Sequence, residues 1–226
     1  MAKRKAKQKS ASQALEALKE GNTRFVNEQF NDPKAKETLR DLEQRERLVA
    51  GQLPWAVVLC CADSRVPPEF IFDCGLGELF TIRVAGNVAN SESIASVEYA
   101  AIKNIGNIGA NLVVVLGHES CGAVKAAIDN AAAQKPADLG PHINGLLSYL
   151  TPAVSKLSPK RVMEFNNKSL SAKKKHGTLT TAVKANAINS VHELNTLSSK
   201  IPNEDGLIVV PAIYQLATGK VDFFEA

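Results

Sequence analysis

The chain has 226 residues, a length that suits one large domain. Hydrophobic residues make up 45% of it and charged residues 22%, values that are ordinary for a globular protein with a sizeable core. The formal net charge of +4 is mild, and no segment reaches the roughly 18 consecutive apolar residues typical of a transmembrane helix. We therefore expect no nucleic-acid partner and no membrane partner.

Basic residues are concentrated at the N-terminus, and we predict a disordered tail at residues 1–11 before a single domain at residues 12–226. No apolar stretch follows the basic residues, which argues against a secretory signal. The cysteines lack the pattern of a disulfide framework and suit a reducing compartment, so we expect a cytoplasmic protein. They are Cys60, Cys61, Cys74 and Cys121.

Hydrophobic spacing predicts the secondary structure in chain order. In the first half we expect helices at 12–30 and 37–49, a strand at 55–60, a short helix at 70–74, a strand at 79–84, a helix at 91–105 and a strand at 112–116. In the second half we expect helices at 122–133, 143–157 and 178–199, a strand at 207–214 and a short antiparallel strand at 221–224. The basic stretch 158–176 fits no element clearly.

Helices alternate with strands along most of the chain, which indicates an α/β fold. We predict a mostly parallel central β-sheet, with about four parallel strands plus an antiparallel C-terminal strand. Helices flank this sheet, and an N-terminal helical arm precedes it.

Metal-ligating side chains follow two of the predicted strands. Cys61 and Asp63 come after the first strand, and His118 and Cys121 come after the third. Positions two apart on an extended chain point the same way, and an i, i+3 pair can converge on one point. Thiolate, imidazole and carboxylate are the ligands of tetrahedral zinc. The sequence therefore predicts a zinc site at the carboxyl ends of the strands, where α/β sheets bind ligands.

Asp63 distinguishes this site from a closed structural zinc. Arg65 lies two residues away, and pairing with it would draw the carboxylate off the metal and leave the open position that catalysis needs. A water at that position becomes a nucleophile near neutral pH. A cluster of reduced thiols beside an unrelated core histidine is the alternative. We expect Cys60 and Cys74 to be small buried residues outside the site.

At these residues the chain resembles the β-class carbonic anhydrases. Their pattern Cys-x-Asp-x-Arg followed by His-x-x-Cys stands here as Cys61-Ala-Asp63-Ser-Arg65 and His118-Glu-Ser-Cys121. Further similar stretches are 18–25, 77–87, 96–100 and 213–221. The resemblance implies one zinc ion per subunit, with Cys61, His118 and Cys121 as constant ligands. It also implies reversible hydration of CO2 to bicarbonate and a proton.

The resemblance further implies the roles of the residues around the zinc. Zinc-bound hydroxide would attack CO2, oriented by Asp63 in its pairing with Arg65. In a closed, inactive state Asp63 would instead be a fourth ligand. The residues that would line the substrate pocket are Gln52, Phe80, Tyr99 and Gly122. Read without the family, Phe80 and Tyr99 are plausible core residues of any fold.

Some members of this family are switched by bicarbonate at a second site, marked by a tryptophan three residues before the first cysteine ligand. Val58 occupies that position here, and Trp55, the one tryptophan of the chain, is out of register. We therefore predict the open form near neutral pH, with Asp63 paired to Arg65, and no bicarbonate switch.

The family also implies a homodimer or a tetramer of dimers, with the first helix wrapping a neighbour. Two other interpretations of the function stay open. One is hydrolysis of carbonyl sulfide or carbon disulfide at the same zinc site. The other is a non-catalytic scaffold stabilised by zinc, whose basic tail binds an acidic partner.

Overall fold

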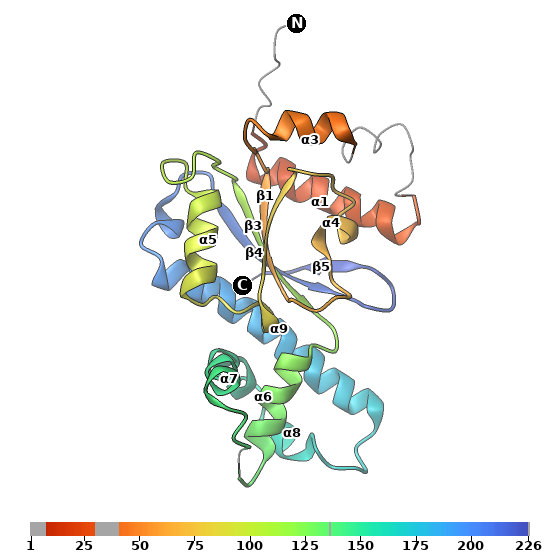
Figure 1. Cartoon of the computed structure of the whole chain (residues 1–226). Helices are drawn as coiled ribbons and strands as arrows, with labels where there is room; N and C mark the ends of the chain where they lie inside the picture. The colour runs from red at the N-terminus through yellow and green to blue at the C-terminus, as the bar shows by residue number, and fades with distance from the viewer. Residues whose placement is uncertain (1–7, 30–40, 136, 226) are drawn as a thin grey trace, which may run out of the picture.

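The computed structural model describes residues 8–29, 41–135 and 137–225, and a sheet of five strands lies at its centre (Figure 1). The strands are β1 (Ala56–Cys60), β2 (Leu79–Arg83), β3 (Leu112–His118), β4 (Ile208–Tyr214) and β5 (Val221–Phe223). Their order is β2-β1-β3-β4-β5, and the pairs are parallel except for the antiparallel pair β4–β5. The predicted parallel sheet with an antiparallel C-terminal strand is confirmed.

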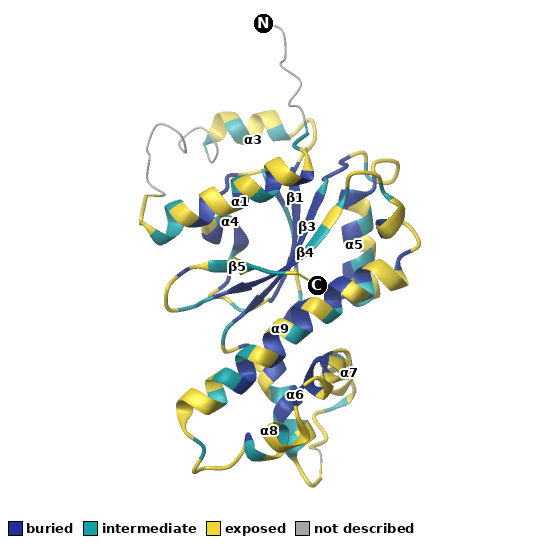
Figure 2. Cartoon of the chain, turned by 180° about the vertical axis from the view of Figure 1, so that it is seen from behind, coloured by how far each residue is buried: buried dark blue, intermediate teal, exposed yellow. Residues whose placement is uncertain are grey.

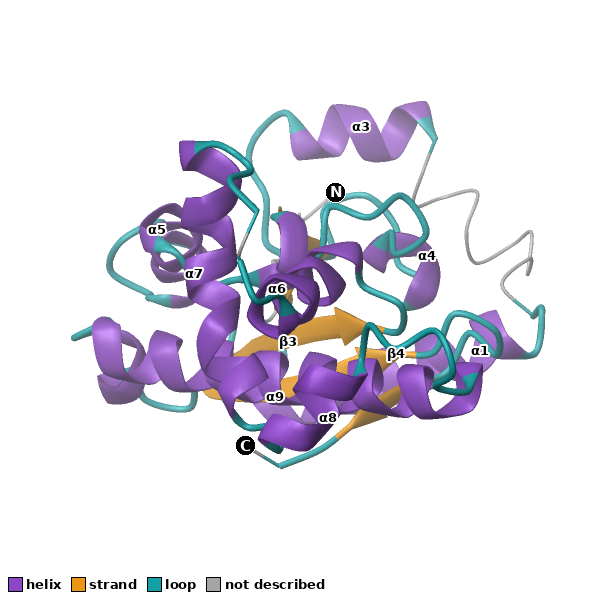
Figure 3. Cartoon of the chain, turned by 90° about the horizontal axis from the view of Figure 1, so that it is seen from below, coloured by secondary structure: helices purple, strands orange, loops and turns teal. Residues whose placement is uncertain are grey.

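Helices pack around these strands (Figure 3). They are α1 (Ala11–Val26), α3 (Leu42–Leu48), α4 (Pro68–Ile71), α5 (Ser91–Ala101), α6 (Gly122–Ala132), α7 (Pro141–Ser155), α8 (Pro159–Glu164) and α9 (Ala172–Leu197), with short 3-10 turns η2 (Ala85–Asn87) and η3 (Ile201–Asn203). Within the described ranges, no helix combines the length and the apolar character needed to cross a membrane.

The central strands are covered on both faces, which explains why their sequences are almost continuously apolar. In β1, Val57 and Leu59 face the cluster formed with α5 and the second half of α9. Val58 and Cys60 face the cluster formed with α1, α4, α6 and α7. Figure 1 shows α5 on one side of the sheet and α1 and α4 on the other, and Figure 2 shows the central strands β1 and β3 as buried.

Helix α1 is bound firmly to its own chain. Ser10 and Gln13 form a reciprocal cap at its start, and Ala14 and Leu18 are fully buried in the core. A side chain at Gly21 would lie 1.9 Å from the Phe72 carbonyl oxygen, so only glycine allows α1 to approach α4 so closely. Its buried face packs against the chain's own core, and its contact with a neighbouring subunit stays a prediction.

The domain begins earlier than predicted. Residues 8–11 were placed in a disordered tail, yet Gln8 donates hydrogen bonds to the carbonyls of Pro54 and Ile108. Lys9 lies 4.5 Å from the centre of the Trp55 ring. These contacts fasten the start of the chain beside β1. The remaining tail, residues 1–7, lies outside the described residues.

Two helix boundaries differ from the predictions for a local reason. The helix predicted at 91–105 ends at Ala101, because the chain then folds back and Gly106 packs against the Tyr99 carbonyl. Ile105, which lies beyond the end of this helix, is 47% exposed. The unassigned stretch 158–176 forms α8 and the start of α9, each capped by a serine hydroxyl. Of the helix predicted at 37–49, the described part is α3, whose residues are not buried.

Candidate metal centre

The topology of the sheet creates the site. From β1 the chain passes to β2 on one side and then returns to β3 on the other, so a crevice opens between the carboxyl ends of β1 and β3. Cys61 directly follows β1, His118 is the last residue of β3, and Cys121 caps the N-terminus of α6. Their ligand atoms lie within 4.8 Å of one another, and all three residues are buried. The predicted ligand set is brought together.

The environment of His118 fits a metal. The ring is fully buried, and its Nδ1 atom lies 2.8 Å from the Glu119 carbonyl oxygen. A proton on Nδ1 serves that contact and leaves the lone pair of Nε2 free, the arrangement that orients metal-binding histidines. Nε2 is buried and makes no hydrogen bond among the described residues, although buried polar atoms are usually paired. A zinc ion held by this ring and the two sulfur atoms would satisfy it.

The side chains of Cys61 and Cys121 are hydrogen-bonded to each other. The hydrogen bond from the Cys121 thiol lowers the pKa of Cys61 to about 4, and the same contact raises the pKa of Cys121. The backbone N–H of Gly86 also donates to the Cys61 sulfur at 3.3 Å. Cys61 is therefore ready to bind a metal as a thiolate, and Cys121 must lose its proton when a metal binds.

Asp63 lies beside the three ligands but is held by Arg65. Its Oδ1 atom accepts from Nε of Arg65 at 2.9 Å and its Oδ2 atom from Nη2 at 2.6 Å. This pairing holds the pKa of Asp63 well below its usual range. Oδ2 is 3.9 Å from Nε2 of His118, so the carboxylate borders the metal position. Arg65 also donates to the Ser120 carbonyl at 3.4 Å, which connects the two ligand loops.

Arg83 belongs to the site although our sequence analysis gave it no role. Its Nε atom donates to the Cys61 carbonyl at 3.2 Å, and its Nη2 atom donates to the Asp63 carbonyl at 2.6 Å. The side chain thus holds the loop that carries a ligand and its neighbouring carboxylate. A charged residue at the end of an apolar strand was the available signal, because β2 runs parallel to β1 and ends beside the same loop.

The predicted substrate-binding residues are divided between the two ends of the sheet. Gly122, at the start of α6, is exposed next to the ligand Cys121. Phe80 is paired with Val57, so at about 3.3 Å per residue it lies about 13 Å before Cys61 along the strands.

Tyr99 and Gln52 lie with Phe80, away from the ligands. The ring of Tyr99 is 6.1 Å from that of Phe80, and Gln52 precedes β1 in an exposed loop. Tyr99 is 46% exposed and so is not a core residue, whereas Phe80 is partly buried and packs against the core. Within one chain these three residues do not reach the metal centre.

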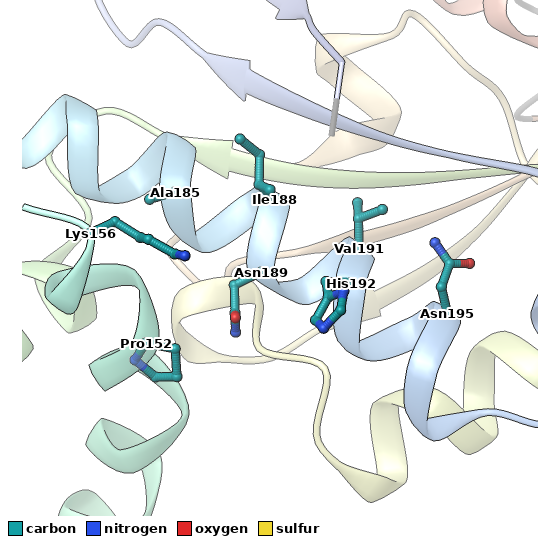
Figure 4. A pocket seen from close by; sticks show the side chains of 8 residues that line it. All are labelled: Pro152, Lys156, Ala185, Ile188, Asn189, Val191, His192 and Asn195. Atoms are coloured by element: carbon teal, nitrogen blue, oxygen red, sulfur yellow. The ribbon is translucent and has the colours of Figure 1, made fainter.

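The other two cysteines are buried outside the site, as expected. Cys60 is fully buried, and burial raises its pKa to about 12; burial also raises the pKa of Cys74. A separate cavity of about 610 Å³ lies between α7 and α9, lined by residues that include Lys156, Asn189 and His192 (Figure 4). It contains no predicted site residue, so the metal centre is identified by its chemistry and not by a large hollow.

Comparison with known proteins adds sequence similarity to this geometry. A sequence profile of the family described as carbonic anhydrase matches residues 56–221. Carbonic anhydrase 2 of Mycobacterium tuberculosis is 43% identical over 141 residues, which cover 62% of this chain and 63% of that protein. A carbonic anhydrase of Mycolicibacterium smegmatis is 45% identical over 115 residues, 51% of this chain and 52% of that protein. The similarity thus spans less than two thirds of these relatives.

Solved structures share the fold over nearly the whole chain. The β-carbonic anhydrase CafA of Aspergillus fumigatus has a TM-score of 0.63 at 26% identity, covering 94% of this chain and 89% of that one. One of two tetrameric β-carbonic anhydrases from Sordaria macrospora has a TM-score of 0.65, covering 94% of this chain and 96% of that one. At 18% identity, the latter likeness concerns the fold alone.

Proposed function

We propose that this chain, which belongs to the β-class carbonic anhydrase family, catalyses zinc-dependent reversible hydration of CO2 to bicarbonate and a proton. The observation that carries this proposal is the convergence of Cys61, His118 and Cys121 beside the Asp63–Arg65 pair. These three residues would hold one zinc ion per chain. When bound, zinc supplies a Lewis acid that makes a water molecule acidic enough to attack CO2 near neutral pH.

Asp63 orients the attacking group in this proposal. Ionised and held by Arg65, its carboxylate accepts hydrogen bonds but has no proton to donate. It therefore accepts a hydrogen bond from the O–H of the nucleophile and directs the oxygen lone pair toward CO2. The pairing with Arg65 also supports the open form as the resting state. Gly122 is exposed at the N-terminus of α6, and its backbone N–H would help to hold an oxygen of the substrate.

The substrate pocket is completed by a second copy of the chain. Gln52, Phe80 and Tyr99 are too far from their own metal centre but are exposed or partly exposed, and so available to the centre of a partner. This arrangement gives a homodimer with two equivalent sites, in keeping with the symmetry of most soluble oligomers. A tetramer of dimers is compatible with it.

The proposal is tested by stopped-flow CO2 hydration with metal analysis of each variant. Cys61→Ser removes a ligand, and we expect loss of zinc and of activity. Asp63→Asn retains the zinc but lowers kcat about 100-fold or more, because the orienting carboxylate is gone. Asp129→Asn is the matched control, since it removes a carboxylate that pairs with Lys125 outside the site.

Two results would contradict the proposal. Full hydration activity in Cys61→Ser would show that the three-residue site is not used. Rapid sulfide release from carbonyl sulfide or carbon disulfide, without CO2 hydration, would assign the same centre to a different substrate.

A further inference from the structure

The turn η2, which follows β2, has an unusual backbone. Gly86 and Asn87 both have positive φ, at 71° and 45°. This conformation is uncommon outside glycine, although asparagine adopts it more readily than other residues. A side chain at Gly86 would also meet Leu150 at 3.1 Å and Ala123 at 3.3 Å. The turn is therefore held in one particular shape.

That shape serves the metal centre, because it directs the backbone N–H of Gly86 at the Cys61 sulfur, 3.3 Å away. A hydrogen bond to a thiolate stabilises its charge and fixes its orientation. One end of the turn is fastened to β1, where the N–H of Val84 donates to the Cys60 carbonyl at 3.0 Å.

The other end is held by α9, through residues about a hundred positions further along the chain. Nδ2 of Asn186 donates to the Gly86 carbonyl at 2.7 Å, and Oγ of Ser190 donates to the Asn87 carbonyl at 3.1 Å. Asn186 and Ser190 are each 1% exposed. They lie four positions apart on one face of α9, directly against the turn.

We propose that Asn186 is a positioning residue for the metal ligand Cys61, acting through Gly86. The side-chain amide of Asn186 holds the Gly86 carbonyl, and this contact keeps the N–H of Gly86 directed at the Cys61 sulfur. Ser190 holds the carbonyl of Asn87, one residue further from the sulfur, and fixes the turn without touching the residue that donates. The inference rests on the proposed metal site but not on the proposed reaction.

A direct test uses the folded protein loaded with cadmium-113 in place of zinc. A hydrogen bond from the Gly86 N–H to a cadmium-bound Cys61 sulfur transmits scalar coupling between the amide proton and the metal. We expect this coupling in the unsubstituted protein and in Ser190→Ala, and its loss in Asn186→Ala. Absence of the coupling in the unsubstituted protein would overturn the inference whether or not the variants fold.

Zinc affinity, measured by competition with a chelator, gives the second readout. Loss of a hydrogen-bonding partner behind a ligand typically weakens metal binding 10–100-fold, so we expect Asn186→Ala to raise the zinc Kd about tenfold or more. Ser190→Ala also loses one buried hydrogen bond to the same turn, so we expect its thermal unfolding temperature to be similar to that of Asn186→Ala. Its zinc Kd, in contrast, should stay within about twofold of that of the unsubstituted protein.

The outcomes separate the two proposals. Equal zinc Kd values for the unsubstituted protein and Asn186→Ala, or equal weakening in both variants, would overturn the role of Asn186 and leave the proposed function standing. Failure of the unsubstituted protein to bind zinc would overturn both.

Discussion

At the scale of single residues, the hydrogen bond between the thiols of Cys61 and Cys121 sets the pH dependence that we expect of metal binding. Near neutral pH the lowered pKa of Cys61 makes it a thiolate, whereas the raised pKa of Cys121 keeps that sulfur protonated. Zinc takes both sulfurs as thiolates, so binding must expel the proton of Cys121. Acid therefore competes with the metal for one sulfur atom.

We expect zinc binding near pH 7 to release about one proton from the cysteine pair. Because the pKa of Cys61 is lowered and that of Cys121 is raised, the apparent zinc affinity should rise about tenfold per pH unit as the pH increases from about 7. Titration calorimetry in buffers of different ionisation enthalpy measures the released protons. Cys74→Ala is the control, because this buried thiol lies outside the site and should not change the count. Release of two protons would contradict a pre-formed Cys61 thiolate.

The ligands could be predicted from the sequence because their chemistry lies in side chains at fixed spacings. Cys61, His118 and Cys121 each follow an apolar strand closely, and parallel strands bring such positions to one edge. The Cys61 sulfur also accepts a hydrogen bond from a backbone N–H, that of Gly86, and every residue type except proline can provide such a group. The role of Asn186 could not be predicted from the sequence either, because it depends on which turn α9 packs against.

At the scale of elements, Asn22 fastens α1 to two distant parts of the chain. Its Nδ2 atom donates to the carbonyls of Ile71 and Gly219, and its Oδ1 atom accepts from the N–H of Val221. The residue is 7% exposed. One side chain therefore ties the first helix to α4 and to the β4–β5 connection.

Replacing Asn22 by alanine should leave these three backbone groups without their partner. Unsatisfied buried groups cost about 1–3 kcal/mol each where water cannot reach them, so we expect the free energy of unfolding to fall by about 2–3 kcal/mol. Urea unfolding followed by circular dichroism measures it. The neighbouring Thr23→Ala changes an exposed position and should remain within about 0.5 kcal/mol of the unsubstituted protein. Equal free energies of unfolding for the two variants would show that the hydrogen bonds of Asn22 do not stabilise the packing of α1.

Element types were easier to predict than element ends. Long apolar runs predicted the strands, and the helices between them predicted that neighbouring strands are parallel. The end of α5 was missed because it depends on Gly106 packing against an earlier turn, a contact between positions that hydrophobic spacing does not relate. The start of α9 was missed because its first residues are mostly lysines, which carry no apolar period, although Ser171 was an available cap.

At the scale of the whole molecule, residues proposed for one pocket are separated in each chain. Asp63 lies at the carboxyl ends of the strands, and Tyr99 lies with Phe80 nearer their amino ends. A pocket that needs both must draw them from two copies. The sequence could not show this, because a family motif names the residues of a pocket without saying which copy supplies each.

Mixed oligomers test the shared pocket. Asp63→Asn and Tyr99→Ala should each be impaired, but in a mixed dimer one site receives an intact Asp63 from one chain and an intact Tyr99 from the other. Random 1:1 mixing makes about half of the dimers mixed, each with one complete site, so activity should reach about a quarter of that of the unsubstituted protein. No gain on mixing two folded, exchanging variants would place both residues in a single chain's pocket.

The adjacency of β1 and β3 also dictates when the metal site can exist. Its ligands are joined by residues 62–117, a segment that must fold before Cys61 and His118 meet. The turn behind Cys61 is held by α9, whose residues are synthesised later still. A chain emerging from the ribosome therefore contains all three ligand residues well before it contains α9, which holds the turn behind Cys61. We expect tight metal loading to be a late event in maturation, one that reports completion of the fold and does not nucleate it.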